Sequence, residues 1–97
     1  MDYNVNKLKG FILEYLIKKG KFGGAHTPID NVLHNMPSRL LHNKKSMKAV
    51  DVAIKELANI GWVIVMKKRT GKGAGLHRAI NPRHIKDIYA FLGLSNI

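Results

Sequence analysis

Apolar residues recur along this chain at helical spacing in some stretches and as a continuous run in another, which predicts where helices give way to strands. The first helical stretch has apolar residues at the i, i+3, i+4, i+7, i+8 spacing of one helix face: Leu8, Phe11, Ile12, Tyr15 and Leu16. Asn4 or Asn6 can cap the start of this helix, and Gly20, which follows two lysines, supplies its end.

A second, short helix is predicted from Thr27-Pro28-Ile29-Asp30. This segment combines an N-cap residue, a proline at the first helical position and a carboxylate that we expect to act as a capping group. Asn35-Met36-Pro37 interrupts the helix, because proline cannot continue it. Residues 38–45 carry only a weak pattern, that of a helical turn followed by a polar corner.

Ser46 is the predicted cap of a third helix, which extends to about residue 60 and is ended by Gly61. Two acidic residues lie on it, and we expect Glu56 to pair with a nearby lysine. The apolar stripe that defines its inner face consists of Val50, Ala53, Ile54, Leu57 and Ala58.

The spacing then changes to that of a β-hairpin. Trp62–Met66 is a β-branched and aromatic run that continues into the polar residues Lys67–Arg69. Thr70–Gly75 is rich in glycine and is predicted to be a loop, after which Leu76–Ile80 forms the returning strand. We expect Trp62, at the start of this hairpin, to anchor the core rather than to stack on bases.

Asn81-Pro82 again combines a cap with a proline and opens a last helix, which Gly93 closes. Its apolar stripe contains Ile85, Ile88, Tyr89 and Leu92. With Tyr15 and Tyr89 expected in the core, the predicted order is helix, helix, helix, strand, strand, helix. Residues 1–97 are therefore expected to form one α+β domain, with no internal repeat or linker.

The charge of the chain narrows the class of partner. Its 97 residues include 17 Lys and Arg against 6 Asp and Glu, a formal net charge of +11. Such a charge concentrates polyanions around the protein, so nucleic acid is the leading partner. An anionic membrane surface, an acidic protein or simple solubility are the alternative explanations. Residues 57–86 hold no acid but seven bases: Lys67, Lys68, Arg69, Lys72, Arg78, Arg83 and Lys86.

Several chemistries are excluded or unsupported by the residues present. The chain has no cysteine, hence no disulfide, thiol nucleophile or thiolate-bound metal. Its five histidines show no metal-binding spacing, and its carboxylates are scattered over separate helix faces or caps. Gly71-Lys72-Gly73-Ala74-Gly75 matches neither a dinucleotide loop nor a phosphate-binding Walker loop. We expect no catalytic residue, no metal and no cofactor.

Helices followed by a basic hairpin resemble a known architecture. The segments Ile29–Leu33, Val50–Val63 and Asn81–Arg83 are similar to those of the small archaeal winged helix-turn-helix proteins. The resemblance implies a winged helix, with a three-helix core, a hairpin wing at residues 62–80 and a C-terminal helix. The helix over about residues 46–60 would then lie in the DNA major groove. One departure is the stretch from Leu33 to Ser46, which is longer than the usual turn.

The predicted function is therefore double-stranded DNA binding in transcriptional regulation. An RNA-binding, ribonucleoprotein or protein–protein adaptor role on the same scaffold is the alternative. The start of the third helix and the wing are expected to lie on one side of the molecule, where both reach phosphates. The residues expected to contact nucleic acid are Lys44, Lys45, Ser46, Lys48, Lys55, Lys67, Lys68, Arg69, Lys72 and Arg78.

Two further expectations concern assembly and location. The last helix carries apolar residues outside its main stripe, namely Phe91 and, beyond it, Leu94 and Ile97. These predict a homodimer formed through the terminal helices, which would set two recognition helices about 34 Å apart. No apolar run is long enough to span a membrane and the chain begins without a signal-like segment, so we expect a cytoplasmic protein without membrane contact.

Overall fold

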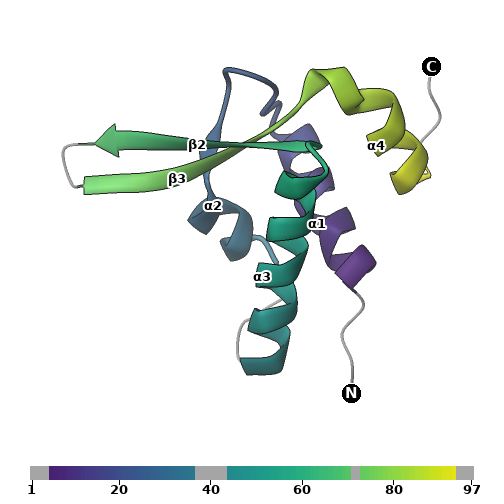
Figure 1. Ribbon diagram of the computed structural model, residues 1–97, viewed down its shortest axis with the longest axis horizontal. Coiled ribbons are helices and arrows are strands. Elements are labelled where there is room, and N and C mark those ends of the chain that lie inside the picture. Colours follow the sequence, from purple (N-terminus) through teal and green to yellow (C-terminus); the bar gives the residue numbers. More distant parts are fainter. Residues whose placement is uncertain (1–4, 37–43, 71–72, 94–97) are drawn as a thin grey trace.

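Four α-helices and a three-stranded antiparallel sheet make up the chain in the computed structural model, which describes residues 5–36, 44–70 and 73–93 (Figure 1). None of the helices in these ranges is both long and apolar enough to cross a membrane. The elements are α1 (Val5–Lys18), β1 (Thr27–Pro28), α2 (Ile29–His34), α3 (Lys44–Asn59), β2 (Val63–Thr70), β3 (Gly73–Ile80), a 3₁₀ turn (Pro82–His84) and α4 (Ile85–Leu92).

The predicted helices are present, and the predicted ends at glycines are confirmed. A glycine follows each of three helices: Gly20, Gly61 and Gly93. Their φ angles are 66°, 81° and 73°, respectively, which is the left-handed conformation that glycine adopts without strain. The predicted start of α3 is wrong, because the helix begins at Lys44 and so includes Ser46 instead of being capped by it. Lysine has a high helix propensity, which allows the helix to extend before the serine.

The first strand was not predicted. Thr27 and Pro28 pair with Arg78 and His77, so β1 is added to the outer side of β3 and the sheet order is β1-β3-β2. Proline is tolerated here because β1 is an edge strand. The expectation that Thr27 caps α2 is wrong, because Pro28 holds the N-cap position and forms no side-chain cap hydrogen bond, while Asp30 lies inside the first turn. Thr27 instead accepts a 3.1 Å hydrogen bond from Asn31 through its hydroxyl.

The hairpin is longer than its sequence suggested. Eight residue pairs join β2 to β3, from Val63↔Ile80 to Thr70↔Gly73. The predicted loop over Thr70–Gly75 is therefore mostly wrong, since only residues 71 and 72 lie outside the paired strands. Ladder hydrogen bonds join backbone groups, so glycine weakens a strand without preventing it.

The core lies where α1 crosses α3 and the root of the hairpin. Fully buried side chains include Ile12 and Leu16 of α1, Leu57 of α3, Ile80 of β3 and Ile88 of α4. Tyr15 and Trp62 are half-buried and pack against this core, as expected. Tyr89 is half-buried but is not among the side chains that pack against it.

Asn81 connects the base of the hairpin to the last helix through hydrogen bonds. The prediction that Asn81 is an N-cap residue is confirmed. Its side-chain oxygen accepts a 3.1 Å hydrogen bond from the Arg83 N–H. Its side-chain amide donates to the Gly61 carbonyl at 2.9 Å, and its backbone N–H donates to the Trp62 carbonyl, also at 2.9 Å. One residue thus joins the end of α3, the start of β2 and the turn that leads into α4.

Candidate nucleic-acid interface

The solvent-facing side of α3 is a basic stripe. Its members recur at three- and four-residue steps, on the side of the helix opposite the buried Val50, Ala53 and Leu57. All of them are exposed. The α3 stripe consists of Lys45, Lys48, Val52, Lys55 and Asn59.

The two acidic residues of α3 are both paired with lysines. Lys55 forms an ion pair with Asp51, one turn earlier on the helix, with 3.0 Å between Lys55 Nζ and Asp51 Oδ2; both side chains are mostly exposed. Glu56 accepts a 2.6 Å hydrogen bond from Lys9 of α1. The expectation that Glu56 pairs with a lysine is confirmed, although that lysine comes from another helix. These pairs reduce the negative potential of α3 near the stripe.

The structure places most of the other residues that were predicted to contact nucleic acid, on the hairpin and at the start of α3. Lys67 is exposed on β2, opposite Leu76. The backbones of Lys68 and Arg69 lie on the same strand. The backbones of Lys44 and Ser46 lie in the first turn of α3. Lys72 lies outside the residues that the structure describes.

Arg78 corrects the sequence-based assignment. It shares a sheet face with the core residue Ile80, and the residue is only 8% exposed, so it does not offer an open phosphate contact. Its Nη1 donates to the neighbouring His77 carbonyl at 3.4 Å, and its Nε has no hydrogen-bond partner in the part of the chain that the structure describes. Burial lowers the pKa of this guanidinium from its ordinary value. The sequence could not reveal this, because the position within the strand decides which face a residue occupies.

The helix α3, which carries the stripe, and the β2–β3 hairpin extend in different directions, and we call them the two arms of the basic surface. Figure 1 shows β2 and β3 leaving the C-terminal end of α3 and running crosswise to it, with the start of α3 well away from the far end of the strands. The hairpin and α3 are therefore set at an angle to each other. With 16 residues in α3 and 8 in each strand, the arms are about 24 Å and 26 Å long. A ligand that contacts both must be extended.

The structure brings together two histidines whose contact the sequence did not indicate. His26 and His77 approach to 2.8 Å between their Nδ1 atoms, with the rings edge to face, because β1 pairs with β3. They are 51 positions apart, so only the unpredicted strand brings them together. Within the described ranges, no three histidine or carboxylate side chains are grouped closely enough to hold a metal ion.

Comparison of the chain with protein families, with curated proteins and with solved structures found no match. The residues and their arrangement are thus the basis for assigning a function.

Proposed function

We propose that this protein is a winged-helix DNA-binding protein that regulates transcription, with α3 as the recognition helix and β2–β3 as the wing. The order helix, strand, helix, helix, hairpin and the β1-β3-β2 sheet fit such an arrangement. The observation that carries the proposal is the α3 stripe. It exposes lysines along one face of a 16-residue helix whose own acids are paired. A helix presented in this way fits the major groove of duplex DNA.

The stripe supports strong backbone contacts and modest base readout. Lys48 and Lys55 suit phosphates, whose contacts position a protein without reading sequence. Between them lies Val52, which can contact a thymine methyl group, and Asn59 further along can bond an adenine edge. Binding is therefore dominated by electrostatics, with weak dependence on sequence.

The first turn of α3 adds to the attraction for an anion. Lys44 and Lys45 lie at the positive end of the helix dipole, and the turn contains no acid. A DNA phosphate near this end would offset the repulsion between these cations and the dipole. The hairpin arm, with Lys67 exposed, extends the basic surface along the duplex.

The proposal is tested by measuring the affinity for duplex DNA, duplex RNA and an acidic peptide over a range of salt concentrations. If about five bases neutralise phosphates, the logarithm of the DNA association constant falls with the logarithm of salt at a slope near −4 to −5. A slope flatter than about −2 would show that the basic surface is not the binding surface. Tighter binding to duplex RNA or to the peptide would instead favour the adaptor role.

A further inference from the structure

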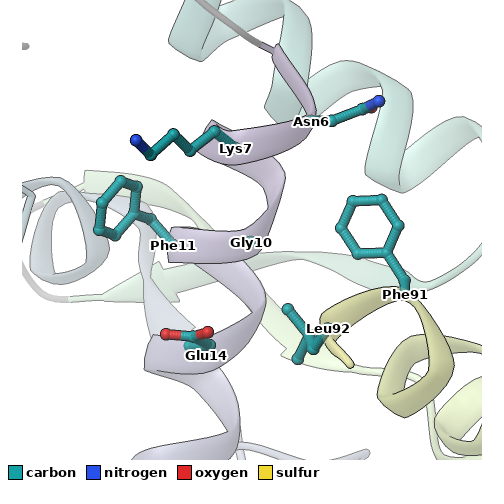
Figure 2. A pocket seen from close by; sticks show the side chains of 7 residues that line it. All are labelled: Asn6, Lys7, Gly10, Phe11, Glu14, Phe91 and Leu92. Carbon is teal, nitrogen blue, oxygen red and sulfur yellow. The ribbon is translucent and has the colours of Figure 1, made fainter. Parts of the chain in front are cut away.

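A hollow lies between α1 and α4, on the opposite side of α1 from its buried face. It has a volume of about 460 Å³ and is centred on Gly10. Figure 2 shows the Phe11 and Phe91 rings on either side of Gly10, with Leu92 beside it. The middle of the hollow is therefore apolar, and its two ends along α1 carry the charged residues Lys7 and Glu14.

The fold of one chain does not require glycine at position 10. Gly10 is within α1 and is not among the glycines with positive φ. Among the described residues, a Cβ atom placed there would meet Leu92 Cδ2 alone, at an ordinary contact distance of 3.8 Å. The missing side chain instead leaves room beside Phe11, enough to receive a group from outside the chain.

The residues around the hollow are arranged to match a second copy of themselves. Lys7 and Glu14 are equally far in sequence from the midpoint between Gly10 and Phe11. If two α1 helices pair antiparallel about that midpoint, each Lys7 lies opposite the partner's Glu14. The same symmetry sets each Phe11 opposite the partner's Gly10. Charge and shape are thus complementary under one two-fold axis.

We infer that a second copy of the chain occupies this hollow, with α1 antiparallel to its counterpart and each Phe11 ring inserted over Gly10 of the other copy. Phe91 and Leu92 of α4 complete the walls that receive the ring. An aromatic anchor in an apolar pocket with charges at the rim is a typical arrangement of a stable interface. The dimer goes beyond the proposed function, because neither the hollow nor its charges belong to the α3 stripe.

Charge reversal tests this register directly. The wild-type chain should have about twice its 10.9 kDa mass in sedimentation equilibrium at micromolar concentration, without nucleic acid. Lys7→Glu alone and Glu14→Lys alone each place like charges opposite one another and should give monomers. An equimolar mixture of these two variants, and the double variant Lys7→Glu/Glu14→Lys, should both recover the dimer, because each restores opposite charges.

Two further variants separate shape from charge. Gly10→Leu fills the hollow and should give a monomer whose circular dichroism spectrum remains helical. Lys19→Glu makes the same charge change at an exposed position just beyond α1 and should remain dimeric. A wild-type monomer at hundreds of micromolar would overturn the inference, and so would a dimer that persists in both Lys7→Glu and Gly10→Leu. DNA binding by a monomeric wild-type chain would overturn this interface and leave the proposed function standing.

Discussion

Lys9 of α1 and Glu56 of α3 form a 2.6 Å ion pair in which the lysine side chain is only 12% exposed, while the glutamate is 48% exposed. The pair ties the two longest helices together beside the core. It also occupies the one α3 carboxylate that faces α1, so that the charge of this glutamate is compensated within the fold.

Glu56→Gln should destabilise the protein by about 1 kcal/mol, because it leaves the Lys9 ammonium without its anion in a largely desolvated place. The double variant Lys9→Met/Glu56→Gln should recover most of that loss, since it removes the stranded charge as well. Urea denaturation of the two single variants and the double variant measures the coupling. Additive effects of the two substitutions would show that the pair contributes nothing.

Lys48→Ala/Lys55→Ala should lower the affinity for duplex DNA by about tenfold or more and flatten the salt slope by about 2. The loss of Lys55 also leaves Asp51 unpaired near the phosphates. Arg83→Ala/Lys86→Ala is the matched control, since both of these residues are exposed but lie outside α3 and the hairpin. Equal losses from both double variants would mean that net charge alone drives binding.

Arg78→Met should stabilise the free protein by about 1 kcal/mol, because it replaces a buried guanidinium, which pairs with no anion among the described residues, by an apolar side chain of similar length. DNA affinity should hardly change, since the guanidinium is covered. Thermal denaturation, together with the DNA titration, measures both effects, and Arg83→Met provides the exposed control. A clear loss of stability would contradict the view that this charge is uncompensated.

Asn81→Ala should destabilise the protein by about 1–2 kcal/mol, because it removes the cap on the Arg83 N–H and the bond to the Gly61 carbonyl. Asn81→Asp keeps an acceptor for the cap but has no amide to donate, so its loss should be smaller. In urea denaturation, the loss in Asn81→Asp measures the bond to Gly61, and the difference between the two variants measures the cap on the Arg83 N–H. Equal losses would assign the whole effect to the bond to Gly61.

The helices could be predicted because their signals are local. Gly61 comes two positions after the last residue of α3, and Asn81 comes directly before Pro82, the first residue of the 3₁₀ turn that leads into α4. These neighbours in sequence are also neighbours in space. The start of α3 was displaced by two residues because Ser46 is tolerated inside a helix whose first residues are lysines.

Features that depend on distant pairing could not be predicted. Strand β1 has two residues and no period, so only its partner β3 defines it. The burial of Arg78 and the approach of His26 to His77 both follow from that pairing. The lysines of the α3 stripe could be predicted from charge, since Lys45, Lys48 and Lys55 are all expected to contact nucleic acid, whereas the exposed Val52 has no distinguishing signal in the sequence.

The edge-to-face contact of Trp62 with Phe91, at 5.5 Å between ring centroids, gives the molecule an internal optical reporter. Trp62 is the only tryptophan in the chain, so its emission comes from one place. That place is the root of the hairpin, and the ring it touches also forms a wall of the hollow on α1. Insertion of a partner's side chain would alter the dielectric surroundings of the indole and shift its fluorescence. Self-association can therefore be followed in the unlabelled wild-type protein by dilution.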